Sequence, residues 1–366
     1  MKLTRLEVWR YDLPLVRPLS LMGRTMATRA GYLIRLTDES GHHGYGEVAP
    51  FPGLHQEDLD QAGRQLHQLG RVLPGAEVPA DIRRLDGAFE DWLGRLNLAP
   101  SVRFGVELAG LNLLAGIEDH PLYDFFSNPA HKSILINGLL TGSMEEVVAQ
   151  AEQLRAEGYQ VVKLKVGRQP LPVDVATVKA VSRVLGDGVK LRLDANRTWS
   201  LAEAVSFGRS LDPDQIEYIE EPVKRPDEVT PFFQQTGIAV ALDESLTELA
   251  GSGSALPKGV RALILKPSLL GGIEKTVWYA RMAELLGLVP VLSSAFDSGV
   301  SLSALAQLAA VLTPPDVAMG LDTYKWLKKD LLTEPFRAEQ GRVDAEEAFN
   351  RSKSIRRDLL KPILGE

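Results

Sequence analysis

Three stretches decide the fold of this chain: VVKLKVG (161–167), VKLRLDAN (189–196) and IEYIEEP (216–222). Each is a short apolar run that ends in charged or polar residues, and a stretch with helical spacing follows it. Five further runs of this kind are SILINGLL (133–140), IAVALDES (238–245), RALILKP (261–267), VPVLSSAF (289–296) and VAMGLDT (317–323). Eight strand signals at a spacing of about 26 residues predict βα units that close into an α/β barrel of the TIM type.

The polar residue near the end of each run favours a barrel over an open sheet. In an α/β barrel the chemistry takes place at the C-terminal ends of the strands, where these residues lie. A doubly wound open sheet binds its ligand at one switch point and does not need polar ends on six successive strands. No GxGxxG sequence follows a strand signal here. The eighth unit is the weakest, because residues 317–323 barely form a strand pattern.

The N-terminal third has a different, mixed α+β pattern. LTRLEVWRYDLPL (3–15) and GYLIRLTDESG (31–41) predict strands, and we expect a flexible loop between them. SVRFGVELAGLNLLAG (101–116) predicts a helix with Ser101 as its N-cap and Gly116 at its end.

Composition excludes several kinds of site. The 366 residues have a formal net charge of −7 and no basic block, which argues against a nucleic-acid partner. Cysteine is absent, which excludes disulfides, thiolate nucleophiles and iron–sulfur clusters. No apolar run approaches the roughly 18 residues of a membrane span, and the charged N-terminal sequence is not a secretory signal. We therefore expect a cytoplasmic protein that does not bind membranes.

Histidine is confined to the first part of the chain. The last of the six histidines is His131, so none lies in the predicted strand ends of the barrel. Acid–base work at such a site falls to Lys, Asp, Glu or Tyr.

Three carboxylates end consecutive strand signals: Asp194, Glu220 and Asp243. The ends of neighbouring barrel strands converge, so uncompensated carboxylates there would repel one another. A divalent cation resolves the repulsion, and all-oxygen ligands suit magnesium. Glu220 is chosen over Glu221 because it shares the register of Tyr218, which is expected to face inward. The alternative is that each acid caps the helix that follows it.

Three lysines accompany these acids. Lys163 and Lys165 lie two apart on one strand and so point to the same face, where their mutual repulsion favours a neutral amine on one of them. A neutral amine is what a general base requires. The alternative is a solvated edge strand with two surface lysines. Lys266 ends a strand across the barrel, and its alternative role is an ion pair with Asp243 or Glu220.

A cation that holds a carboxylate, with lysines on both sides, suits removal of a proton alpha to that carboxylate. The charge then spreads into an enediolate, whose oxygens the cation stabilises. A lysine base paired with magnesium is an established arrangement for this step.

The chain resembles the muconate-lactonizing branch of the enolase superfamily in five motifs, which are KLKVG (163–167), LRLDAN (191–196), YIEEP (218–222), ALDES (241–245) and ILKP (264–267). Four further segments resemble the o-succinylbenzoate synthase family: GYGEVAPFPGL (44–54), KPSLLGG (266–272), LSSAFDSG (292–299) and GLDTYKW (320–326). The resemblance implies an α+β capping domain over residues 1–125 and a modified (β/α)7β barrel over 126–324. The tail, residues 325–366, is expected to pack on the cap.

The resemblance also implies a reaction. This family consists of hydro-lyases that dehydrate 2-succinyl-6-hydroxy-2,4-cyclohexadiene-1-carboxylate to o-succinylbenzoate in menaquinone or phylloquinone biosynthesis. By the same resemblance, Asp194, Glu220 and Asp243 would hold one Mg²⁺. Lys165 would take the alpha proton and return it to the departing hydroxyl, Lys163 would tune Lys165, and Lys266 would stabilise the planar intermediate.

Five more residues are candidates for substrate binding. Ser293, Ser294 and Gly320 match segments that contact the succinyl carboxylate in this family, with strand-to-helix capping as the alternative. Arg24 and Arg29 flank the expected N-terminal loop and would meet an anionic substrate, with an exposed loop as the alternative.

Two other functions stay open at this point. An N-acylamino acid racemase or dipeptide epimerase would use Lys165 and Lys266 as two bases on the same scaffold, although GLDT (320–323) lacks the second acid of the DxD motif usual in dipeptide epimerases. A barrel that only binds or scaffolds would not be expected to keep all six site residues. The oligomeric state stays open as well.

Overall fold

The computed structural model describes residues 1–21, 24–126, 130–252 and 255–365. Seven parallel strands form the larger sheet, in the spatial order β11-β10-β9-β8-β7-β6-β5. They are β5 (Gly138–Leu140), β6 (Val161–Lys165), β7 (Lys190–Asp194), β8 (Ile216–Glu220), β9 (Val240–Leu242), β10 (Val260–Leu265) and β11 (Val289–Leu292). The order follows the chain without exception, as repeated βα units require.

The sheet curls, and irregular backbone bridges its two edges. Gly320 N–H donates to Leu292 O at 2.8 Å, and Met319 N–H donates to Leu135 O at 2.8 Å. Asn137 N–H returns a bond to Met319 O at 2.9 Å. Residues 319–320 therefore occupy the eighth strand position with isolated bridges on both sides, which agrees with the weak strand pattern of this segment.

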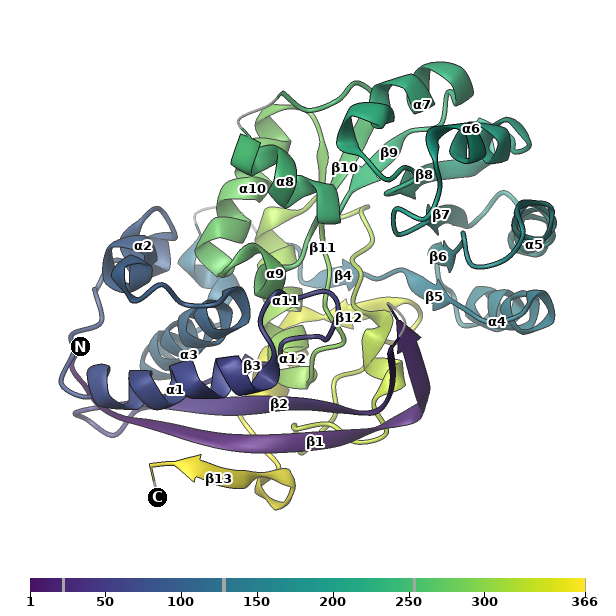
Figure 1. The fold of residues 1–366 in the computed structure, drawn as a ribbon. Helices are drawn as coiled ribbons and strands as arrows, with labels where there is room; N and C mark the ends of the chain where they lie inside the picture. The colour runs from purple at the N-terminus through teal and green to yellow at the C-terminus, as the bar shows by residue number, and fades with distance from the viewer. Residues whose placement is uncertain (22–23, 127–129, 253–254, 366) are drawn as a thin grey trace.

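Helices alternate with the strands and cover the outside of the barrel (Figure 1). They are α4 (Met144–Ala156), α5 (Leu171–Leu185), α6 (Leu201–Arg209), α7 (Val229–Thr236), α8 (Glu244–Ser252), α9 (Pro267–Leu270), α10 (Ile273–Leu285) and α11 (Gly299–Leu312). Ser143 and Ser200 begin α4 and α6 with capping boxes, in which a serine and a glutamate three residues later satisfy each other's backbone N–H groups. Among the described residues, no helix is long and apolar enough to cross a bilayer.

The N-terminal part of the chain forms an antiparallel sheet of order β13-β1-β2-β3. Its strands are β1 (Leu3–Leu21), β2 (Arg24–Asp38), β3 (His43–Val48) and β13 (Lys361–Leu364), and its helices are α1 (Leu59–Val72), α2 (Ala88–Leu93) and α3 (Pro100–Glu118). α3 lies so close to β3 that a Cβ on Gly44 or Gly46 would press on the α3 backbone. The prediction of a loop between residues 15 and 31 is wrong, because β1 extends to Leu21, β2 begins at Arg24, and the two strands pair there.

The expected ends of the helix over 101–116 need correction. The helix begins at Pro100 with Ala99 as N-cap, and Ser101 lies buried inside its first turn. Proline is favoured at the first helical position because its missing N–H would have no partner there. The helix also continues past Gly116 to Glu118.

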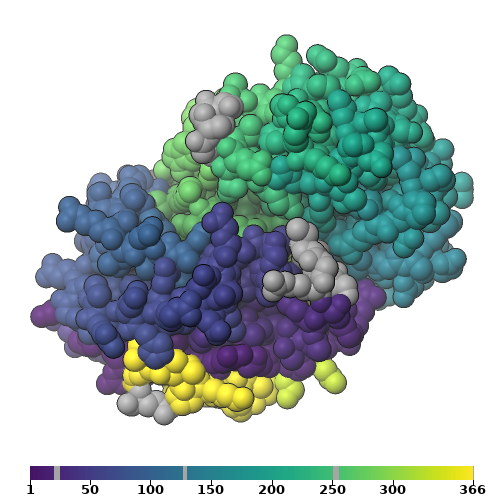
Figure 2. Space-filling model, viewed as in Figure 1, coloured from purple at the N-terminus to yellow at the C-terminus, as the bar shows by residue number. Residues whose placement is uncertain are grey.

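The C-terminal tail returns to the N-terminal sheet. β13 pairs antiparallel with β1, and Figure 2 shows the yellow tail against the lower edge of the purple segment. β12 (Arg342–Asp344) pairs with β4 (Ser133–Leu135), and α12 (Ala345–Ser352) packs beside α11. Teal and green barrel units form the upper part of the same view.

Candidate active site

Three carboxylates lie side by side at the C-terminal ends of adjacent strands. Asp194 and Glu220 are the last residues of β7 and β8, and Asp243 follows β9 directly. Asp194 pairs in register with Glu220 and with Lys165 of β6. All three acids are at most 6% exposed, so they meet in a desolvated site.

Lysine ammonium groups lie between these acids. Lys163 Nζ is 2.9 Å from Asp194 Oδ2 and 2.6 Å from Glu220 Oε2. Lys165 Nζ is 2.7 Å from the same Asp194 oxygen, and Lys266 Nζ contacts Asp243 Oδ2. In the part of the chain that the structure describes, no three acidic or histidine groups already gather around one point at ligand distance. The acids are instead neutralised by the lysines.

One buried oxygen in this cluster has no partner. Glu220 Oε1 is fully buried and makes no hydrogen bond to any described residue. Burial, reinforced by the neighbouring Asp194 charge, raises the pKa of Glu220 to about 7. An unpartnered buried carboxylate oxygen is costly unless it has a ligand. Together with an all-oxygen donor set of three acids, it fits a hard divalent cation such as magnesium.

The pKa values of the two lysines of β6 are shifted in opposite directions. Burial lowers the pKa of Lys165; Asp194 opposes this effect and the Lys163 charge adds to it. Burial acts on Lys163 as well, but Asp194 and Glu220 outweigh it and hold the pKa of Lys163 well above its usual range. The pKa of Lys165 thus shifts in the direction that favours a neutral amine, and burial, not repulsion by Lys163, is the largest cause.

Lys266 follows β10, and three strands separate β10 from β6 in the curled sheet. The ion pair with Asp243, left open as its alternative role, is formed. Burial lowers the pKa of Lys266, but Asp243 and Glu220 outweigh it and raise that pKa above the usual range. Lys266 is thus held as an ammonium ion on the other side of the carboxylate cluster from Lys165.

Two residues that were not expected from the sequence complete the cluster. Lys165 Nζ donates to Asn196 Oδ1 at 2.7 Å, and Asn196 stands in the LDAN run two residues beyond Asp194. Glu221 turns away from the lysines and accepts the N–H groups of Asp243 and Ser245, both at 2.8 Å. It therefore fixes the backbone next to Asp243. In the sequence, the only sign of this role is that Glu221 directly follows Glu220, the predicted metal ligand.

A pocket opens beside the lysines. Lys163, Lys165 and Lys266 line it together with Ser293, Ser294 and Gly320. Ser293 Oγ and Ser294 Oγ lie 3.3 Å and 3.4 Å from Gly320 O, so these three residues are brought together. The helix-capping alternative is wrong for both serines, because Ser298 is the N-cap of α11. Arg168, Phe296 and Trp326 also line the pocket and were not expected from the sequence.

The two arginines expected to bind substrate have different outcomes. The side chain of Arg24 lies outside the described residues, although its backbone begins β2. Arg29 is 2% exposed and donates to five main-chain carbonyls, so its placement as a substrate-binding residue is wrong. A guanidinium with every N–H in use has none left for a ligand.

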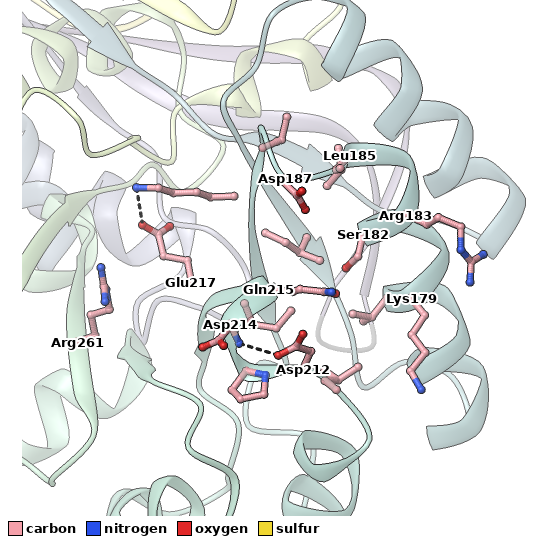
Figure 3. A pocket seen from close by; sticks show the side chains of 18 residues that line it. Lys179, Ser182, Arg183, Leu185, Asp187, Asp212, Asp214, Gln215, Glu217 and Arg261 are labelled. Carbon is pink, nitrogen blue, oxygen red and sulfur yellow. Dashed lines mark hydrogen bonds and ion pairs between the residues drawn. The ribbon is translucent and has the colours of Figure 1, made fainter.

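A second hollow lies at the opposite, N-terminal ends of β7 and β8. Figure 3 shows Arg261 and Glu217 on one side of it and Lys179, Ser182 and Arg183 of α5 on the other. The charged groups spread around an open rim and do not converge on one point. It contains none of the expected site residues.

Comparison with known proteins places this barrel in a family. Residues 146–349 match the enolase C-terminal domain-like family, and residues 3–113 match the MenC N-terminal domain. In the fold, a substrate-liganded L-Ala-D/L-Glu epimerase from Bacillus subtilis is similar over 100% of this chain and 98% of its own, with 25% identity and a TM-score of 0.82. The fold and the site therefore define this protein as a member of the enolase superfamily, with a barrel and an N-terminal domain.

Sequence relatives narrow the class. The o-succinylbenzoate synthase of Klebsiella pneumoniae (strain 342) is 32% identical over 89% of this chain and 92% of the relative. Protein PHYLLO, a chloroplastic protein of Arabidopsis thaliana, is 34% identical over 83% of this chain, which spans only 20% of that longer protein. The chain belongs to the o-succinylbenzoate synthase family of the enolase superfamily.

Proposed function

We infer that this protein is an o-succinylbenzoate synthase, a hydro-lyase of menaquinone or phylloquinone biosynthesis. It dehydrates 2-succinyl-6-hydroxy-2,4-cyclohexadiene-1-carboxylate to o-succinylbenzoate. One observation carries the proposal: Lys165 and Lys266 lie on opposite sides of three buried acids, one of which has an oxygen without a partner. Family membership supports the same conclusion.

The three acids are assigned to one Mg²⁺. Asp194, Glu220 and Asp243 supply the oxygens, and the unpartnered Glu220 Oε1 is available to it without breaking a hydrogen bond. When bound, the cation stabilises the negative charge that develops on a substrate carboxylate. Lys163 stays protonated, and its ammonium group lies beside both Asp194 and Glu220, where it favours their ionised forms.

Lys165 is assigned as the base. Its lowered pKa increases the fraction that is neutral near pH 7, and its contact with the Asn196 amide orients its Nζ. It takes the proton alpha to the carboxylate, and the ammonium so formed gives that proton to the departing hydroxyl. Lys266 remains an ammonium ion and stabilises the anion from the other side.

The rest of the pocket is assigned to the succinyl end of the substrate. Ser293, Ser294 and Gly320 line it, and Arg168 brings a cation to its mouth. Gly167 N–H, just before Arg168, donates to buried Asp174 at 2.7 Å, which fixes the loop that carries the arginine. We assign the cap to residues 1–125 and the barrel to residues 126–324.

A dipeptide epimerase is the second candidate, because it would use the same two lysines. Such an enzyme must bind a substrate ammonium group, for which a free carboxylate is the natural partner. Asp322 lines the pocket, but Tyr159 OH donates to its Oδ1 at 2.8 Å and Leu139 N–H to its Oδ2 at 3.1 Å. Lys325 Nζ also lies 3.4 Å from Oδ1, so the charge of Asp322 already has a cationic partner, and this favours the anionic substrate.

The test compares substrates and metal-site variants in one assay. With Mg²⁺, the protein should convert the cyclohexadiene acid to o-succinylbenzoate faster than it epimerises any dipeptide. Asp194→Asn, Glu220→Gln and Asp243→Asn should each lose activity with an unchanged circular dichroism spectrum. Activity that survives thorough chelation would overturn the metal assignment, and preferred turnover of a dipeptide would overturn the substrate.

A further inference from the structure

Arg29 connects the N-terminal sheet to a barrel loop that lines the pocket. It lies on β2 and makes five hydrogen bonds, one for each N–H that a guanidinium carries. Nε donates to Phe296 O at 3.0 Å, and Nη2 donates to Ala295 O at 3.4 Å. The other three acceptors belong to the N-terminal part of the chain and are Ala30 O (3.0 Å), Pro50 O (3.2 Å) and Ala49 O.

The loop that Arg29 holds has an unfavourable backbone conformation. Phe296 has a φ of 60°, in the left-handed region that a bulky residue adopts only where its surroundings impose it. Its ring packs 5.4 Å from Phe51 and 5.8 Å from Trp326, between centroids, and it lines the pocket. The Arg29 Nε bond therefore acts on the residue whose backbone most needs support.

Two buried acids hold the next residues of the same loop. Asp297 Oδ1 lies 3.7 Å from Arg29 Nη2, and its Oδ2 accepts Ala295 N–H at 2.9 Å. Glu47 of β3 accepts Ser298 N–H at 3.0 Å and 3.2 Å. The loop is thus fixed from residue 295 to residue 298 by side chains of the sheet and of the loop itself.

We propose that Arg29 is a positioning residue: it holds residues 295–297 in the conformation that shapes the pocket across the barrel from Lys165, without touching substrate. The proposal rests on the function proposed above and adds to it a dependence of the pocket on docking of the N-terminal sheet. Loss of Arg29 weakens substrate binding through the loop and leaves Lys165 and the three acids in place. The reaction of bound substrate therefore continues.

The experiment uses Arg29→Met, Arg29→Lys and a matched control, Arg35→Met. Arg35 lies on the same strand and pairs with Glu7 at 2.6 Å, away from the loop. Both Arg29 variants should raise KM at least about ten-fold, with kcat within about three-fold, since a hydrogen bond from a charged donor contributes a factor of that size. Lysine should not rescue, because one ammonium cannot supply five donors in a fork. Arg35→Met should leave KM unchanged.

Native-state hydrogen exchange gives a readout that needs no turnover. In both Arg29 variants the amides of residues 294–298 should exchange faster, while those of β7 keep their rates. If the wild-type protein did not turn over the cyclohexadiene acid, this result alone would decide the proposal. Exchange in the loop as slow as in the wild type would overturn it. A normal KM in Arg29→Lys beside a raised KM in Arg29→Met would also overturn it, because charge alone would then suffice.

Discussion

Removing each of the two opposed lysines should have different effects on proton transfer. Lys165→Ala should abolish both dehydration and exchange of the alpha proton with deuterated solvent, because no other described lysine with a lowered pKa lies at the cluster. Lys266→Ala should slow dehydration and still allow slow proton removal by Lys165 in single-turnover experiments. In an epimerase, by contrast, one lysine would remove the alpha proton and the other would return a proton to the opposite face. Epimerisation would therefore require both Lys165 and Lys266.

The size of the Lys266 effect follows from its surroundings. Lys163 and Lys266 have side chains only 13% and 12% exposed, so charges at this site are poorly screened by water. A unit charge about 4 Å away at an effective dielectric near 20 contributes about 4 kcal/mol. This corresponds to a loss of about 10³-fold in kcat, close to the roughly 10²–10³-fold cost of removing one such donor in other enzymes. Lys165→Ala should reduce kcat by more than Lys266→Ala does, because no base is then left to remove the alpha proton.

The assay follows product formation by absorbance and alpha-proton exchange by NMR in D₂O with Mg²⁺ present. Lys190→Ala is the matched control, since Lys190 begins β7 at the opposite end of the barrel and its side chain is 55% exposed. It should retain full activity. Persistent alpha-proton exchange in Lys165→Ala, or complete loss of single-turnover proton removal in Lys266→Ala, would refute the assignment of one base and one electrostatic group.

Two further predictions concern binding and stability. Arg168→Ala should raise KM for the cyclohexadiene acid about ten-fold and change kcat little, as steady-state kinetics would show; an unchanged KM would exclude Arg168 as a carboxylate partner. Burial raises the pKa of Glu107 from 4.5 to about 7, so the native state holds a proton that the unfolded state has lost. The free energy of unfolding is therefore highest below about pH 4.5 and falls as the pH rises through 7. At 1.36 kcal/mol per pKa unit, the total decrease is about 3 kcal/mol. Urea unfolding from pH 4.5 to 8 should show this slope, and Glu107→Gln should flatten it; an equal slope in both proteins would contradict the assignment.

Much of the barrel was predictable because its βα units repeat. Each apolar run could be assigned to a strand from its own residues alone. The ends of strands that are neighbours in a closed sheet are then close together in space. The positions of Asp194, Glu220 and Asp243 follow from this geometry. The eighth unit was expected to be weak for the same local reason, and it forms bridges instead of a strand.

Features that depend on distant backbone could not be predicted in this way. Arg29 was predicted to bind an anionic substrate because it lies at the edge of a segment that was expected to be a loop. Nothing in the local sequence indicates that main-chain carbonyl oxygens surround its guanidinium group. Its acceptors come from residues 30, 49–50 and 295–296, and only the folded chain brings them together. Ser101 was misplaced for a smaller reason, because the proline before it can start the helix equally well.

The choice between the two β6 lysines depends on their neighbours and not on their order in the motif. Both contact Asp194 Oδ2, Lys163 at 2.9 Å and Lys165 at 2.7 Å, so this acid does not distinguish them. Lys163 has a second carboxylate, Glu220, at 2.6 Å, whereas the second partner of Lys165 is the neutral Asn196 amide at 2.7 Å. A second anion stabilises an ammonium ion far more than an amide oxygen does. Lys165 is therefore the lysine that can release its proton, and a change of Asn196 to aspartate should protonate it and slow proton abstraction.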